Sequence, residues 1–183
     1  MKKIAIFLAE GFEEVEALTP VDVLRRANMD VITISISKSK EVTGSHAITV
    51  IADQLFDDTD FSEFDAIILP GGMPGTNNLN QHQALKKLLI DFSNNNKLIG
   101  AICAAPIIIG ELGLLKGKNA ICYPGFEDKL SGAVIQQRAT VCDGGFITAN
   151  GVGSSMKFAL SLVRELCDDE TANELARKMM VGQ

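Results

Sequence analysis

The sequence predicts an α/β protein with a mostly parallel β-sheet and helices on both faces of that sheet. Short apolar runs of strand length alternate with longer amphipathic stretches along the chain, and this alternation is typical of parallel strands joined by crossover helices. With 183 residues, of which 46% are hydrophobic, the chain is long enough to bury a full core. We therefore expect one compact domain over residues 1–183.

The first half of the chain contains four expected strands and one clearly amphipathic helix. The apolar run at residues 3–8 is followed by Glu10 and Gly11 and predicts the first strand. Residues 13–27 begin with acidic side chains and carry apolar residues at helical spacing, which predicts a helix. Further apolar runs predict strands at 31–37, 47–51 and 65–69.

The second half continues the alternation. Residues 83–95 predict a helix, and an apolar run at 97–102 predicts a strand that leads directly into Cys103 and a helix at 104–112. The remaining expected elements are strands at 119–122 and 146–149 and helices at 154–166 and 169–180. Because ligands bind beyond the carboxyl ends of strands in such sheets, we expect the loops after the first, fourth and fifth strands to converge on a site.

Charge and hydropathy disfavour two classes of protein. The net charge of −6 argues against a nucleic-acid-binding protein, which needs a basic surface. The N-terminal apolar run is too short for a signal peptide, and no stretch reaches membrane-spanning length. We expect a soluble cytoplasmic protein whose partners are small molecules or other proteins, and not nucleic acids or membranes.

The four cysteines show no metal-binding or dithiol pattern, since no C-x-x-C pair is present. We expect reduced and mostly buried thiols at Cys122, Cys142 and Cys167. Cys103 differs because it lies at a predicted strand-to-helix turn, where free N–H groups of the helix start lower a thiol pKa. Its neighbours support the turn: Ala104 and Ala105 are small, and proline is tolerated at the start of a helix. Cys103 is therefore a candidate nucleophile.

Glu16 and a glycine-rich segment are the other candidates for chemistry. Glu13 and Glu14 are explained as favourable charges in the first turn of a helix, whereas Glu16 could point into the crevice at the strand ends and hold a proton there. The segment from Pro70 to Gly75 lacks the glycine order of a nucleotide-binding loop. A tight turn that exposes backbone N–H groups is the better interpretation.

The chain has two histidines. His82 is interpreted as a solvated surface residue, and His46, which precedes a short strand, is left open. Neither can be placed beside Cys103, so a cysteine-histidine hydrolase is poorly supported. If the glycine-rich turn lies beside Cys103, the N–H groups of Gly72 and Ala104 could stabilise an oxyanion or a cysteine sulfinate.

Several ordered motifs together resemble one known family. They are Ala9-Glu10-Gly11-Phe12-Glu13-Glu14-Val15-Glu16, Pro20-Val21-Asp22-Val23-Leu24-Arg25-Arg26, Leu69-Pro70-Gly71-Gly72, Ala101-Ile102-Cys103-Ala104-Ala105-Pro106 and Thr148-Ala149-Asn150-Gly151. Over nearly its whole length the chain resembles the DJ-one/ThiJ/PfpI superfamily, most closely its parkinsonism-associated protein deglycase branch.

The resemblance implies a flavodoxin-like three-layer sandwich that forms a homodimer and needs no cofactor or metal. It implies that Cys103 is the nucleophile and Glu16 its protonated partner, with Gly72 and Ala104 as backbone donors. His46 falls where relatives often carry an arginine near the partner subunit's site, and Arg26 falls on another interface arginine. Tyr123 stands where some relatives have a histidine, and Ala104 stands where the protease branch has one, so protease activity is not expected.

Three functions remain open from the sequence. The first is a glyoxalase III or deglycase enzyme in which Cys103 attacks an α-oxoaldehyde such as methylglyoxal or its early adducts. The second is a non-catalytic stress-response protein in which an oxidant converts Cys103 to a sulfinate. The third is a flavodoxin-like domain that binds a small ligand and whose cysteine has no role.

Overall fold

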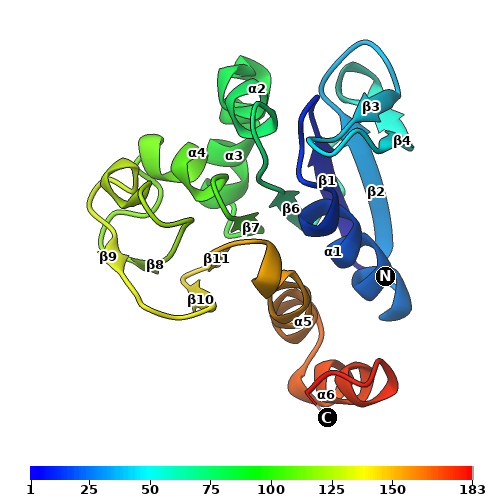
Figure 1. Ribbon diagram of the computed structural model, residues 1–183, viewed down its shortest axis with the longest axis vertical. Helices are drawn as coiled ribbons and strands as arrows, with labels where there is room; N and C mark the ends of the chain where they lie inside the picture. The colour runs from blue at the N-terminus through cyan, green and yellow to red at the C-terminus, as the bar shows by residue number, and fades with distance from the viewer. Residues whose placement is uncertain (183) are drawn as a thin grey trace.

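A seven-stranded sheet forms the centre of the molecule in the computed structural model, which describes residues 1–182 (Figure 1). Its strand order is β10-β11-β7-β6-β1-β2-β5. The strands are β1 (Lys3–Leu8), β2 (Asp30–Ser35), β5 (Gln54–Leu55), β6 (Ala66–Leu69), β7 (Leu98–Ile102), β10 (Thr140–Asp143) and β11 (Phe146–Ala149). Every neighbouring pair is parallel except β10 with β11, which is antiparallel. The expected mostly parallel sheet is confirmed.

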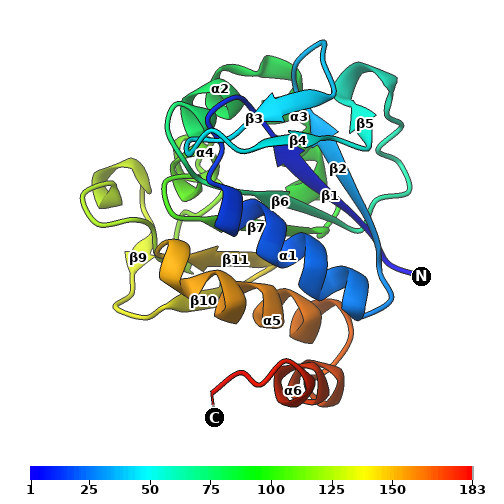
Figure 2. The same ribbon diagram turned by 45° about the vertical axis from the view of Figure 1, so that its right-hand side comes forward.

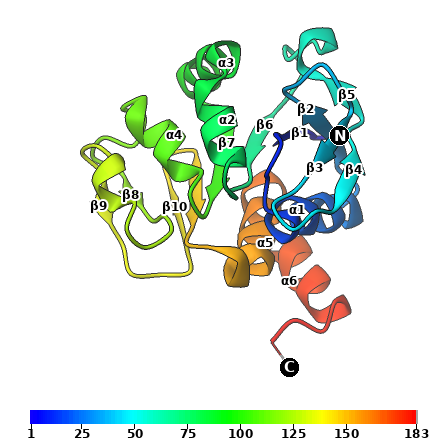
Figure 3. The ribbon, with the colours of Figure 1, turned by 45° about the horizontal axis from the view of Figure 1, so that its top comes forward.

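Helices cover both faces of this sheet and make a three-layer sandwich. On one side lie α1 (Glu14–Arg26), α5 (Ser155–Leu166) and α6 (Asp169–Lys178), and on the other lie α2 (Gly75–Gln81), α3 (Gln83–Asn94) and α4 (Pro106–Glu111). Figure 2 shows α1 beside α5 with α6 beyond them, and Figure 3 shows α2, α3 and α4 on the opposite side. Each layer encloses its own hydrophobic cluster against the sheet.

The apolar run of β1 shows why the strands are apolar throughout. Successive side chains of a strand point to opposite faces. Accordingly, Ala5 and Phe7 pack in the cluster under α2, α3 and α4, whereas Ile4 and Ile6 pack in the cluster under α1 and α5. Both faces of β1 are therefore buried from Ile4 to Leu8, and the polar Lys3 lies at the half-buried start of the strand.

Two of the predicted strands belong to separate small sheets. The run at 47–51 yields β4 (Thr49–Ile51), which pairs antiparallel with β3 (Glu41–Thr43), and the run at 119–122 yields β8 (Asn119–Ala120), which pairs with β9 (Val134–Ile135). Both runs thus form strands as predicted, but in small sheets of their own, because an apolar run indicates a strand but not its hydrogen-bonding partner. The sequence also did not predict β3, β5, β9, β10 or α2, nor the short 3-10 turns Phe56–Asp58, Glu127–Lys129 and Val152–Ser154.

The order of the strands reverses between β1 and β6. From β1 the chain crosses to β2 on one side, and from β6 it crosses to β7 on the other. A crevice forms at such a reversal beyond the carboxyl ends of the strands. The loops after β1, β6 and β7 meet there: the N–H of Glu13 donates to the carbonyl of Gly71 at 2.9 Å, and that of Gly75 donates to Gly11 at 3.1 Å.

The helices of residues 1–182 are all too short or too polar to cross a bilayer.

Candidate active site

Cys103 lies at a strained turn directly after β7. Its φ of +65° is in the left-handed region, which non-glycine residues rarely adopt. Two neighbouring segments hold it there, because its N–H donates to the carbonyl of Ala149 at 2.9 Å and its carbonyl accepts the N–H of Tyr123 at 2.7 Å. The turn aims the half-buried side chain at the carboxyl edge of the sheet, where α4 begins at Pro106.

Glu16 approaches Cys103 from the first turn of α1. The residue is 0% exposed, and its Oε2 accepts the backbone N–H of Gly71 at 2.9 Å. Its Oε1 is buried and makes no hydrogen bond within the part of the chain that the structure describes. A side chain on Gly71 would place its Cβ 2.6 Å from Glu16 Oε2 and 2.7 Å from the Cβ of Cys103. Glycine at position 71 is therefore what lets the carboxyl group and the cysteine lie next to each other.

The environment of the thiol differs from the sequence-based expectation. Hydrogen bonds from the N–H groups of Ala104 and Gly72 lower the pKa of Cys103, as expected of donors at this turn. Burial, the charge of Glu16 and a hydrogen bond with Glu16 act more strongly and raise that pKa to about 12. While Glu16 is ionised, the expectation of a lowered thiol pKa is not met, because loss of solvent and the neighbouring carboxylate outweigh two amides.

Glu16 also titrates away from its ordinary range. Burial, together with the charge of Glu13, raises its pKa from 4.5 to about 7, although hydrogen bonds with Cys103 and Gly71 oppose the change. The two groups lose their protons one after the other, so near neutral pH they hold one proton and one negative charge between them. When the proton is on Glu16, the sulfur is a thiolate that faces two N–H donors and a carboxylic acid.

Two of the expected auxiliary residues lie away from the sulfur. Arg26 is ten residues beyond Glu16 on α1, which corresponds to about 15 Å along a helix, and its guanidinium donates to Asp22 at 2.7 Å. The imidazole of His46 is held by Glu14 instead, with 2.9 Å between Nδ1 and Oε2. Any role for Arg26 or His46 at a partner subunit's site stays a prediction.

Tyr123 contributes its backbone to the turn and leaves its ring half-exposed. Besides donating its N–H to Cys103, it places its ring within 3.5 Å of the position that a Cβ on Gly151 would occupy. No hydrogen bond of its hydroxyl is found among the described residues, so no neighbouring group there would activate the hydroxyl as a base.

His82 is not the solvated residue that the sequence predicted. Its Nδ1 accepts the N–H of Leu85 at 3.0 Å at the start of α3. The centroid of its ring lies 4.5 Å from the ring centroid of Phe56. Burial lowers its pKa. The histidine therefore has a structural role as a helix cap, which its polar sequence neighbours concealed.

The cysteine expectations hold only in part. All four cysteines are free thiols and Cys122 is buried, but Cys142 and Cys167 are exposed. Cys142 lies on the edge strand β10, where it alternates with the buried Val141, and Cys167 lies just after α5. A strand buried on one face exposes every second residue, and the sequence did not reveal which face carries Cys142.

Glu14 is a buried side chain that the sequence analysis treated as an ordinary helix-start charge. Its side chain is 5% exposed, and its Oε1 accepts the N–H of His46 at 2.7 Å. The adjacent Glu13 caps α1 by accepting the N–H of Glu16 at 2.7 Å. No local pattern separates these roles, because the distant loop at residues 44–48 creates the environment of Glu14.

The glycine-rich segment is packed against protein. Gly72 has a φ of +91°, and a Cβ there would lie 2.4 Å from the backbone nitrogen of Glu13. The backbone of this turn thus contacts the loop after β1 and points an N–H at the thiol, as expected of a tight turn.

The fold and the site together define a class of protein. Its members are α/β proteins with a strained cysteine and a buried glutamate at the carboxyl edge of the sheet. A family model described as "DJ-1/PfpI family" matches residues 2–165. The chain belongs to the DJ-1/PfpI family, which confirms the resemblance inferred from its motifs.

Individual relatives agree with this assignment. "Protein DJ-1 homolog B" of Arabidopsis thaliana is 38% identical over 98% of this chain, and the chain spans only 42% of that relative's length. "Protein dj-1beta" of Drosophila melanogaster is 31% identical over 99% of this chain and 98% of its own. Among solved structures, oxidized Toxoplasma gondii DJ-1 matches with a TM-score of 0.95 and 32% identity over 100% of both chains. The flavodoxin-like fold is thereby confirmed.

Proposed function

We propose that the protein is a cysteine-dependent, cofactor-independent enzyme that detoxifies α-oxoaldehydes such as methylglyoxal, or their early adducts on amines and thiols, in a stress response. The observation that carries this glyoxalase III or deglycase activity is the pairing of Cys103 with the buried Glu16 across Gly71. Membership of the DJ-1/PfpI family supports the same assignment.

The reaction uses the single proton that the pair holds. The thiolate of Cys103 attacks the aldehyde carbon, and Glu16 gives its proton to the oxygen to form a hemithioacetal. The resulting Glu16 carboxylate takes the C–H proton from this carbon and returns it to the adjacent carbon, while the hydroxyl proton passes from the first oxygen to the second. The first carbon is thereby oxidised to a thioester, and the second is reduced to an alcohol. Water then cleaves the thioester to a hydroxy acid and restores the thiol. N–H groups of Gly72 and Ala104 stabilise charge beside the sulfur.

Lactate formation from methylglyoxal tests this proposal. The wild-type protein should produce lactate, while Cys103→Ser and Glu16→Gln should each lose at least about a hundredfold in rate, as expected for loss of a nucleophile or a proton shuttle. Cys142→Ser is the matched control, because it removes an exposed thiol on the edge strand β10, which β11 separates from β7. Equal rates of lactate formation by wild type and Cys103→Ser would disprove the proposed enzyme activity.

A second candidate function is peroxide sensing, which the free and half-buried Cys103 thiol favours. A peroxide would transfer oxygen to the sulfur in two steps and leave water each time, and the resulting sulfinate would accept the N–H groups of Gly72 and Ala104. The similarity to a DJ-1 structure described as oxidized supports this reading.

Intact mass under mild peroxide separates the two functions. Gain of two oxygen atoms at Cys103 without lactate formation would favour sensing. Oxidation spread over all four cysteines would argue against a dedicated sensor.

We further propose that the protein forms a homodimer through the exposed face of α1. Val15, Leu18 and Ile48 are large exposed apolar side chains. They line one shallow depression together with Met156 and with the polar residues Glu14, Thr19 and Asp22. Contiguous apolar surface of this kind marks an interaction site.

A further inference from the structure

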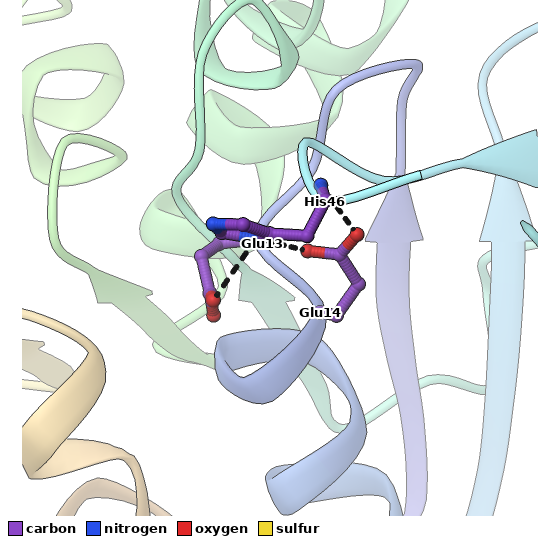
Figure 4. A group of neighbouring side chains, drawn as sticks. All are labelled: Glu13, Glu14 and His46. Atoms are coloured by element: carbon purple, nitrogen blue, oxygen red, sulfur yellow. Dashed lines mark hydrogen bonds and ion pairs between the residues drawn. The ribbon is translucent and has the colours of Figure 1, made fainter. Parts of the chain in front are cut away.

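Three potential metal ligands meet where α1 begins, although they come from two separate segments. Glu13 and Glu14 stand at the start of the helix, and His46 lies in the loop between β3 and β4. One ligand atom from each residue lies within 4.8 Å of the other two. Figure 4 shows the imidazole of His46 reaching over the helix start toward both carboxylates.

Each carboxylate has one oxygen anchored by a backbone amide and another directed at the imidazole. Glu14 Oε1 accepts the N–H of His46 at 2.7 Å, and its Oε2 lies 2.9 Å from His46 Nδ1. Glu13 Oε2 accepts the N–H of Glu16 at 2.7 Å, and its Oε1 lies 3.8 Å from the same Nδ1. Outer hydrogen bonds that orient ligand atoms in this way are characteristic of metal sites.

The charge of the cluster also suits a cation. Two carboxylates lie side by side, and among the residues described the basic side chain that pairs with them is His46. A helix N-terminus contributes about half a positive charge, which is too little to balance two full negative charges. In the single chain the site is open on the side of His46, whose side chain is 68% exposed, and closed on the side of Glu14, whose side chain is 5% exposed.

We propose that Glu13, Glu14 and His46 bind a divalent cation of the zinc class, with His46 Nδ1, Glu14 Oε2 and Glu13 Oε1 as ligands. Carboxylate and imidazole together match the preference of such ions, which sit about 2.0–2.2 Å from these atoms. The cation takes the place between the ring nitrogen and the carboxylates that a proton otherwise fills. Water completes the coordination on the exposed side. The proposal uses no atom of Cys103 and does not depend on the proposed enzyme activity.

The two histidines of the chain allow a direct test. Zn²⁺ is titrated into chelator-treated protein that carries Cys103→Ser, Cys142→Ser and Cys167→Ser, so that neither the active-site thiol nor the exposed thiols compete. The imidazole proton resonances should shift for His46 and stay in place for His82, which serves as an internal control. Calorimetry on the same protein provides the affinity.

Substitutions then identify the ligands. His46→Ala and Glu13→Gln should each weaken Zn²⁺ binding about tenfold or more, whereas Glu41→Gln, which removes one exposed carboxylate from the neighbouring strand, should not. If circular dichroism shows that Glu14→Gln is folded, this variant should lose as much Zn²⁺ affinity as Glu13→Gln. If Glu14→Gln is not folded, the affinities of His46→Ala and Glu13→Gln test the proposal. An unmoved His46 resonance at saturating Zn²⁺, or equal affinities for His46→Ala, Glu13→Gln and Glu41→Gln, would overturn the proposal.

Discussion

Cys103 combines two unfavourable features in one residue. A left-handed backbone at a non-glycine position costs about 1–3 kcal/mol, and burial beside Glu16 raises the pKa of its thiol to about 12. The hydrogen bonds to Ala149 and Tyr123 keep the backbone in place despite this cost. Such strain, held by surrounding structure at a ligand-facing edge, is typical of functional sites.

Glu16→Gln should stabilise the protein increasingly as the pH rises. The folded-state pKa of Glu16 is raised from 4.5 to about 7, so its contribution to stability is fully present below pH 4.5 and is lost as the pH rises through about 7. Glutamine does not ionise and avoids this loss, which amounts to up to about 3 kcal/mol. Urea denaturation of variant and wild type at pH 4.5 and pH 8 measures the difference in their free energies of unfolding. The same difference at both pH values would contradict the raised pKa of Glu16.

The rate at which iodoacetamide modifies Cys103 should also follow the pair. In the wild type we expect the rate to rise through pH 7, where the pair loses its first proton, and then to level off. In Glu16→Gln this step should vanish, because only the thiol titrates. Cys103→Ser supplies the background from the other cysteines, and an unchanged step near pH 7 in Glu16→Gln would show that the two groups are not coupled.

Gly71→Ala should disrupt the site by steric overlap. The added methyl group would lie 2.6 Å from Glu16 Oε2 and 2.7 Å from the Cβ of Cys103, so we expect a loss of about 1–3 kcal/mol in stability together with a slower reaction of the thiol. Gly153→Ala is the matched control because no atom lies within 4 Å of its added Cβ. Thermal unfolding and the alkylation rate measure both effects, and wild-type values for Gly71→Ala would refute the close packing.

At the scale of elements, the beginnings of helices carry much of the specific chemistry. Glu13 caps α1, and His82 caps α3. The same principle operates at Cys103, where the turn into α4 presents the N–H of Ala104 to the sulfur. Unpaired N–H groups at a helix start need acceptors, and in this protein side chains of quite different kinds supply them.

His82→Ala should therefore destabilise α3. Loss of the cap should cost about 1 kcal/mol at pH 8, and His82→Asn, which restores an acceptor, should recover part of that stability. Because burial lowers the pKa of His82, its stabilising effect is present at high pH and is lost as the pH falls and the ring becomes protonated. Urea denaturation followed by circular dichroism at pH 8 and pH 5 measures the change, and a larger loss at pH 5 would contradict the capping role.

At the scale of the whole molecule, the depression on α1 should govern assembly. Light scattering should show a dimer for the wild type and a monomer for Leu18→Glu, because a buried unpaired carboxylate opposes association. Val134→Glu is the matched control, since it alters an exposed apolar residue on the separate strand β9. A dimer that survives Leu18→Glu, or that is lost in Val134→Glu, would place the interface elsewhere. The cytoplasmic location and the extent of one domain to residue 183 stay predictions, the last residue being outside the described range.

The sequence by itself determined the α/β architecture, the positions of the buried strands and the family, because continuous apolar runs and ordered motifs are local properties of the chain. It also singled out Cys103 and Glu16, since a strand-to-helix junction and a carboxylate among apolar residues are visible in one dimension. Only the tertiary structure decided that β4 and β8 leave the main sheet, that Cys142 is exposed and that His82 caps a helix. It also brought His46 to Glu13 and Glu14 and revealed that burial raises the pKa of Cys103. These features depend on solvent exclusion and on contacts between distant segments, neither of which a local pattern encodes.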